Sequence, residues 1–133
     1  NQSISISRDD GLKLNNLYLT TALKCVPPED KPKPDELKMC FKFFKEEINY
    51  LIKINTIVAL GKIAFDTCLN FYMQDYDLKR KDFIFHHGAK YILPDKKFLI
   101  GSYHPSPRNV NTGRIDENKM VKLLKKVQKV LNR

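Results

Sequence analysis

The sequence predicts an α/β fold, and three observations lead to that prediction. The short apolar run at residues 56–60 is typical of a parallel strand that is covered on both faces, and the run at 98–100 indicates a buried strand over 98–103. Helices are predicted at 34–52, before the first of these strands, and at 62–72, after it, and the apolar residues of 34–52 recur at helical spacing. Alternation of strand and helix along a chain is typical of a sheet covered by helices.

The composition favours one globular domain with a polyanionic partner. The 133 residues are 42% hydrophobic, which is enough for a core. Twenty-four Lys and Arg against fifteen Asp and Glu give a net charge of +9, and nucleic acid is the leading partner for such a surface. A generally lysine-rich surface, as in some thermophile proteins, is the alternative that charge leaves open.

Neither a membrane span nor a secretion signal is recognisable. No apolar run approaches the ~20 residues that cross a bilayer, so we expect an intracellular protein, cytoplasmic or nucleoid-associated, with no membrane partner. Three cysteines, an odd number, favour thiols or metal ligands over a disulfide scaffold. The first residue is Asn1 and not methionine, so we expect further sequence before it.

The elements of the first half are predicted as follows. Residues 17–23 have the β-branched and aromatic content of a strand. Four prolines between residues 25 and 34 then prevent regular pairing and predict a stiff, extended loop. A helix is expected over 34–52, with one apolar face made of Leu37, Cys40, Phe41, Phe44, Ile48 and Leu51.

The second half continues the alternation. We expect a strand at 56–60, a helix at 62–72, a loop at 73–83, strand segments at 83–88 and 91–93, a turn at 94–97 and a strand at 98–103. The last helix is expected to start near Asp116, with an apolar stripe of Met120, Val121, Leu124, Val127 and Leu131. Its lysines are expected to face solvent.

A polar loop follows the last predicted strand and carries a histidine, His104. Open α/β sheets bind ligands at the carboxyl ends of their strands, which is where this loop lies. Its other polar residues can donate, accept or pair with phosphate: Ser106, Arg108, Asn109, Asn111, Thr112 and Arg114. On spacing alone, an ordinary connection with a hydrogen-bonded histidine is favoured over a catalytic one.

The cysteines and the other histidines give weaker signals. His86 and His87 project to opposite sides of an extended segment, so structural roles are favoured for both. The proline loop could bring Cys25 and Cys40 together, but closed zinc or iron-sulfur sites need four ligands. Either the remaining ligands come from elsewhere or these are simple thiols. Cys68, within a predicted apolar helix, is expected to be a buried thiol.

Several blocks of sequence, in order along nearly the whole chain, resemble a known family. They are Ser7-Arg8-Asp9-Asp10-Gly11-Leu12, Thr20-Thr21-Ala22-Leu23-Lys24-Cys25-Val26-Pro27-Pro28, Lys31-Pro32, Ile57-Val58-Ala59-Leu60-Gly61-Lys62-Ile63-Ala64-Phe65 and Ser102-Tyr103-His104-Pro105-Ser106, followed by Asn109, Thr112, Gly113 and Arg114. These blocks are similar to the uracil-DNA glycosylase superfamily, and in particular to its iron-sulfur-containing fifth family (type b) of archaea and thermophilic bacteria.

The resemblance implies a three-layer α/β/α fold whose mainly parallel sheet has four strands, one central strand being supplied by a segment before Asn1. Residues 1–133 would then be the carboxyl-terminal part of a single domain. The missing segment, which would belong to the same protein or to a separate chain, would carry the family's first motif. The implied activity is flipping of uracil, or of another deaminated base, out of DNA and hydrolysis of its glycosidic bond.

The resemblance also implies roles for particular residues. His104 would contact the uracil O2 and stabilise charge on the departing base. Contacts to double- or single-stranded DNA are expected from Lys24, Ser106, Pro107, Arg108, Asn109 and Arg114. Cys25 and Cys40 would be two of the four ligands of a [4Fe-4S] cluster, the other two lying outside this chain.

Two residues depart from the pattern of the family. Thr21 stands where relatives usually carry Ala or Asn, and Asp30 stands where many carry Asn. Both would belong to the base pocket, so recognition there is expected to differ. A catalytically inactive DNA-binding module or subunit of the same fold, and a small α/β protein with an unrelated site, remain the alternatives.

Overall fold

A mixed sheet forms the centre of the computed structural model, which describes residues 1–2 and 4–131 and, for Asp30, the backbone alone. Three strands are present in that part of the chain: β1 (Thr56–Leu60), β2 (Lys90–Ile92) and β3 (Phe98–Ser102). Their order is β1-β3-β2, with β1 parallel and β2 antiparallel to β3. The α/β class is confirmed.

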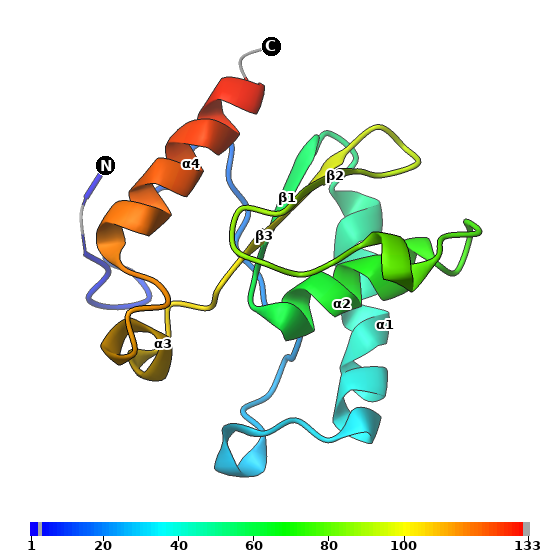
Figure 1. The fold of residues 1–133 in the computed structure, drawn as a ribbon. Coiled ribbons are helices and arrows are strands. Elements are labelled where there is room, and N and C mark those ends of the chain that lie inside the picture. Colours follow the sequence, from blue (N-terminus) through cyan, green and yellow to red (C-terminus); the bar gives the residue numbers. More distant parts are fainter. Residues whose placement is uncertain (3, 132–133) are drawn as a thin grey trace.

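Helices lie on both faces of the sheet (Figure 1). The helices are α1 (Pro34–Tyr50), α2 (Lys62–Tyr72), α3 (Pro107–Asn111) and α4 (Glu117–Leu131), with short 3-10 turns η1 (Pro28–Asp30) and η2 (Arg80–Asp82). On the α1 and α2 side the core contains Phe44, Phe65, Leu69 and Leu99, all buried. On the other side Leu123 and Val127 of α4 pack around Ile100 of β3.

The strand expected at residues 17–23 is wrong for this structure. The segment is not part of the sheet, and Leu17 and Leu19 are 62% and 72% exposed. A strand needs a neighbour to satisfy its backbone groups, and no described strand lies beside this segment. Its side chains contact α1 instead, as described below.

The strand segment expected at 83–88 is also wrong. This stretch has no ladder partner and folds over the sheet, where Tyr91 of β2 holds it. The Tyr91 hydroxyl accepts the Ile84 N–H and donates to the Ile84 carbonyl, both at 2.8 Å, and the Phe83 and Tyr91 ring centres lie 5.1 Å apart. One backbone bond to the sheet remains at the end of the stretch, from the Gly88 N–H to the Gly101 carbonyl of β3 at 2.8 Å, and the side-chain contacts hold the residues before it.

The last helix begins at Glu117, one residue after the predicted start, but its buried face differs from the predicted stripe. Leu123 is buried, whereas Val121, Leu124 and Leu131 are 40%, 46% and 42% exposed. Hydrophobic periodicity shows that a helix has an apolar side without showing which part of it meets the sheet. Within the described residues, no helix is both long and apolar enough to span a bilayer.

Candidate functional site

An open cavity of about 510 Å³ lies at the carboxyl ends of β1 and β3. Because these strands are parallel, their carboxyl ends meet at one edge of the sheet, and the loops after both strands line the cavity. The lining residues are Leu60, Gly61, Lys62, Ile63, Phe85, Tyr103, His104, Asn109 and Arg114. The structure therefore brings His104, Asn109 and Arg114, three of the residues singled out in the sequence, to one cavity.

His104 is held in this cavity through its backbone and by a glycine beneath it. Its carbonyl accepts hydrogen bonds from the Ser106 N–H at 2.8 Å and from Asn109 Nδ2 at 2.9 Å. Gly61 follows β1 with a φ of +99°, and a Cβ on it would lie 3.2 Å from the His104 Cβ. Only glycine combines that backbone conformation with so close an approach.

The loop after His104 becomes a short helix, α3. Ser106 precedes the helix and its Oγ accepts the Asn109 N–H at 3.4 Å, while Pro107 occupies the first helical position. Ser106 and Asn109 thus have structural partners of their own. Arg108 is exposed on this helix, and Arg114 follows it at the cavity wall.

Aromatic rings form the wall of the cavity beside His104. The Phe85 and Tyr103 ring centres are 6.0 Å apart, and the His87 ring stacks against Tyr103 with ring centres 5.8 Å apart. His87 Nδ1 lies 3.2 Å from the buried Ser102 Oγ, and partial burial, with Lys119 nearby, lowers the pKa of His87. Phe85, Tyr103 and Gly61 were missed as site residues in the sequence. Gly61 and Tyr103 stand within the blocks that resemble the family, and Phe85 belongs to the aromatic run at residues 83–85, so these were the signals that could have found them.

The two cysteines expected to be ligands lie beside each other. Cys40 is buried in α1 and Cys25 is exposed. The Lys24 N–H donates to Cys40 Sγ at 3.5 Å, and desolvation together with the neighbouring Cys40 raises the pKa of Cys25. Cys68 is separate and buried, and desolvation raises its pKa to about 12.

This pair fits half of a cluster site. Thiolates are the ligands of iron-sulfur clusters, and the exposed Cys25 lies at the surface, where further ligands could approach, while Cys40 is buried behind it. Among the described residues, no group of three or more His, Cys, Asp or Glu side chains is arranged to hold a metal. Any complete site would need ligands from outside these residues.

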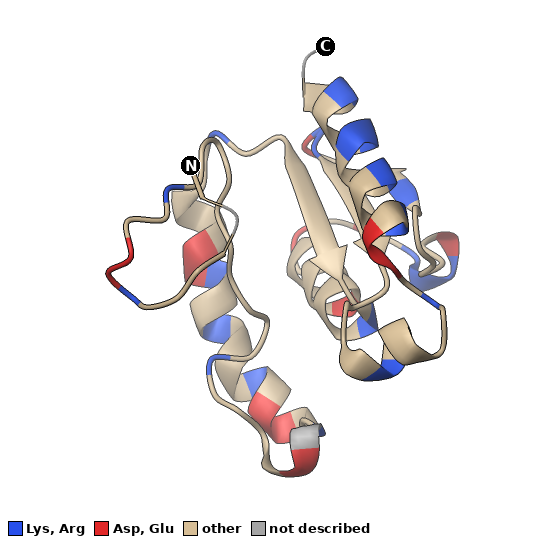
Figure 2. Ribbon diagram, turned by 90° about the vertical axis from the view of Figure 1, so that its left-hand side faces the viewer, with Lys and Arg blue, Asp and Glu red and all other residues tan. Residues whose placement is uncertain are grey.

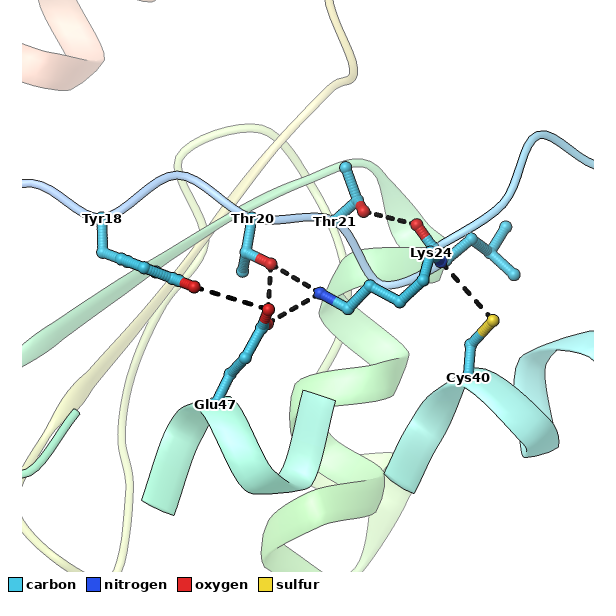
Figure 3. Close-up of polar contacts among 7 residues, drawn as sticks. Tyr18, Thr20, Thr21, Lys24, Cys40 and Glu47 are labelled. Carbon is cyan, nitrogen blue, oxygen red and sulfur yellow. Dashed lines mark hydrogen bonds and ion pairs between the residues drawn. The ribbon is translucent and has the colours of Figure 1, made fainter. Parts of the chain in front are cut away.

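The segment that precedes Cys25 is fastened to α1 by polar side chains (Figure 3). Glu47 Oε2 accepts hydrogen bonds from Lys24 Nζ and from Thr20 Oγ1, both at 2.7 Å. Thr21 is turned to its own chain and donates to the Leu23 carbonyl. Lys24, expected to contact DNA, thus has an acidic partner in this structure. The side chain of Asp30 lies outside the described part.

Positive charge is spread over the exposed side of α4, as the blue bands in Figure 2 show. The lysines there are Lys119, Lys122, Lys125, Lys126 and Lys129, all exposed, as predicted. Lys119 is the member of this set that pairs with an acid, Asp116. The basic residues that line the cavity are Lys62 and Arg114, and Arg108 is exposed on α3.

Comparison with known proteins identifies the family. The family model of the uracil DNA glycosylase superfamily matches residues 2–128. The chain belongs to the uracil DNA glycosylase superfamily. The resemblance inferred from the sequence blocks is therefore confirmed.

Among its relatives in this superfamily is the "Type-5 uracil-DNA glycosylase" of Thermus thermophilus, 36% identical over 121 residues, which are 91% of this chain and 53% of that protein. The protein of the same name from Pyrobaculum aerophilum is 33% identical over 126 residues, 95% of this chain and 52% of its own length. A "Type-4 uracil-DNA glycosylase" from Archaeoglobus fulgidus is 29% identical over 101 residues, 72% of this chain and 48% of its own length. The chain spans about half the length of the curated relatives it matches.

Proposed function

We propose that the protein to which this chain belongs is a DNA repair glycosylase that flips uracil out of DNA and hydrolyses its N-glycosidic bond. The observation that carries the proposal is the cavity beside His104, at the carboxyl ends of two parallel strands, in a chain of this superfamily. Its volume of about 510 Å³ is ample for a nucleobase, and its aromatic wall offers a surface for a flipped base.

His104 would act on the leaving group. Cleavage of the glycosidic bond places negative charge on the departing uracil, and a positioned donor stabilises that charge more in the transition state than in the ground state. The backbone hydrogen bonds to the His104 carbonyl and the tight fit over Gly61 support such a positioned donor.

Thr21 and Asp30 would also belong to the base pocket, and the DNA backbone would be bound near the mouth of the cavity. Arg108 on α3 and Arg114 after it are suited to phosphate, with Ser106, Pro107 and Asn109 shaping the segment between His104 and Arg114. The partner in this proposal is uracil-containing DNA, double- or single-stranded.

The sheet would be completed by a fourth strand beside β1. The strand order of the described residues places β1 at an edge, although Ile57 to Leu60 are apolar and the whole strand is half-buried or buried, as is typical of an interior strand. A parallel strand beside β1, from a segment that precedes residue 1 or from a separate chain, would give the mainly parallel four-stranded sheet. These residues would then be the carboxyl-terminal part of one glycosylase domain.

A [4Fe-4S] cluster is part of the proposal, with Cys25 and Cys40 as two of its four ligands. The adjacent sulfurs, one at the surface, support this. When bound, a cluster here would crosslink the proline-rich loop to α1. The remaining thiolates would come from the same completing segment.

Excision by the full-length protein is the direct test. The protein is incubated with a duplex that contains one uracil, and abasic sites are detected by alkaline strand cleavage, with a thymine duplex as control. We expect cleavage of the uracil duplex alone. Tight binding of DNA without abasic sites would contradict the proposal and favour an inactive DNA-binding module.

A further inference from the structure

Residues 17–23 have no strand beside them in the described part of the chain. Backbone hydrogen bonds to a sheet therefore do not hold this segment. Yet Lys24 and Cys25 follow the segment directly, and Cys25 has to stay beside Cys40 of α1 if the two are to share a ligand site. Some other contact must fix the segment on α1.

A single carboxylate on α1 makes those contacts. Glu47 Oε2 accepts from Lys24 Nζ and Thr20 Oγ1 at 2.7 Å, and Lys24 Nζ also donates to Thr20 Oγ1 at 2.7 Å. The Tyr18 hydroxyl reaches Glu47 Oε1 at 3.4 Å. Figure 3 shows that the side chains of the segment converge on Glu47 from above the helix.

Glu47, Lys24 and Thr20 are joined pairwise by hydrogen bonds and are here called the clamp. The clamp restricts the residues that lie between Thr20 and Lys24 in the chain. Thr21 lies between Thr20 and Lys24 in the chain, and Cys25 follows Lys24 directly. The Lys24 N–H, on the same residue, donates to Cys40 Sγ at 3.5 Å. One residue therefore joins Glu47 through its side chain and Cys40 through its backbone.

We propose that Lys24 and Glu47 are positioning residues, which hold Cys25 against Cys40 and set the place of Thr21, and that Lys24 does not contact DNA phosphate. The Lys24 and Glu47 side chains are only 25% and 27% exposed. To reach a phosphate, Lys24 would have to leave a partly buried carboxylate without its cation, which is unfavourable. Arg108, which has no acidic partner among the described residues, does not face that competition.

The clamp is tested in the full-length protein with Lys24→Met and Glu47→Gln. Glu46→Gln is the matched control, because Glu46 is the neighbouring acid on α1 and is exposed, with no ion pair in the described structure. The first readout is the loss of absorbance near 400 nm in the presence of an iron chelator. Removing groups that orient metal ligands typically weakens metal binding about 10-fold or more, so we expect both clamp variants, and not Glu46→Gln, to lose the cluster about 10-fold faster.

The second readout is the salt dependence of duplex binding, which rests on the proposed binding of DNA, as the first readout rests on the proposed cluster. Each phosphate contact contributes about 0.9 to the slope of log affinity against log salt. We expect Lys24→Met to keep the slope of the parent protein and Arg108→Met to lower it by about 0.9. A lower slope for Lys24→Met, with cluster loss unchanged, would overturn the inference, as would a Lys24→Met protein unchanged in both readouts.

Two additions keep the result independent of folding and of the cluster. The charge-swapped protein, Lys24→Glu with Glu47→Lys, should retain its cluster better than a protein with either of these two changes alone. A lost contact between Lys24 and phosphate would not be recovered by the swap. If the purified protein is colourless, the rate at which Cys25 reacts with a maleimide replaces the absorbance. We then expect that rate to change in the clamp variants alone, and equal rates in all variants would contradict the clamp even if uracil excision were established.

Discussion

His104 is the residue whose replacement should separate catalysis from binding. We expect His104→Ala to raise the activation free energy of excision by about 3 kcal/mol and so to lower the rate roughly 100-fold. The reason is that a donor aimed at leaving-group charge acts mainly in the transition state. Duplex affinity should stay nearly unchanged, because His104 lines the cavity proposed for the base, whereas the phosphate contacts are proposed for Arg108 and Arg114. Single-turnover rates and direct binding measurements check this. Equal losses in rate and affinity would make His104 a residue that only positions the DNA.

Gly61 is expected to act through its contact with His104. Gly61→Ala adds a Cβ 3.2 Å from the His104 Cβ at a φ of +99°, so it should both strain the backbone by about 1–3 kcal/mol and displace the histidine. The matched control is Gly88→Ala, where φ is +80° but nothing lies within 4 Å of the added Cβ.

Both glycine variants should lose stability in denaturant unfolding, and only Gly61→Ala should also lose excision in the folded protein. Similar excision rates for the two variants would show that the close approach to His104 has no catalytic consequence.

At the scale of the elements, one hydrogen bond joins α2 to the turn between β2 and β3. The buried Tyr72 donates from its hydroxyl to Asp95 Oδ2 at 2.9 Å, and Lys97 pairs with the same carboxylate. Because the acceptor is charged, Tyr72→Phe should cost about 2 kcal/mol of unfolding free energy. Tyr76→Phe, which removes a hydroxyl with no hydrogen bond in the described structure, should cost much less. Equal losses in chemical denaturation would mean that the bond contributes nothing.

The same contact predicts a pH dependence of stability. Burial alone would raise the pKa of Asp95, but hydrogen bonds from Lys97 and Tyr72 and the charge of Lys97 lower it below the ordinary 3.8. A carboxyl whose pKa is lower in the folded state stabilises the fold fully above its unfolded pKa, and this contribution is lost as pH falls through the folded value.

The difference in unfolding free energy between the parent protein and Asp95→Asn should therefore be constant above about pH 5 and shrink below pH 4. Unfolding curves from neutral to acid pH measure it. The subtraction removes the contributions of other acids, such as Glu47, whose pKa is also lowered. A difference that does not change with pH would exclude Asp95 as the group responsible.

For the whole molecule, the decisive feature is that β1 is an edge strand among the residues that the structure describes. Asn55 and Gly61 bond to β3 at the two ends of the strand, so in the alternation of a parallel ladder Thr56, Val58 and Leu60 point their backbone groups away from β3. If a strand completes the sheet in the full-length protein, hydrogen exchange should be slow at all five amides of β1. Fast exchange confined to residues 56, 58 and 60 would show that β1 remains an edge.

Several elements could be predicted from the sequence because their signals are local. The helices at 34–50 and 62–72 follow from apolar residues at helical spacing, and Pro34 marks the first turn of the earlier one. The strands at 56–60 and 98–102 follow from short apolar runs, and the loop after the second strand was recognised by its polar composition. The family itself was recognised from blocks of sequence, because residues that shape a site recur in relatives as short motifs.

Only the tertiary structure decided which residues far apart in the chain contact one another. Residues 17–23 have strand composition but do not form a strand, since a strand exists only with a neighbour that pairs its backbone. Gly61 meets His104 because two parallel strands end at one edge, and Lys24 meets Glu47 because the segment crosses α1. These contacts join positions more than twenty residues apart, and no local periodicity carries information about them. They depend on how the packed elements are placed, which is a property of the whole chain.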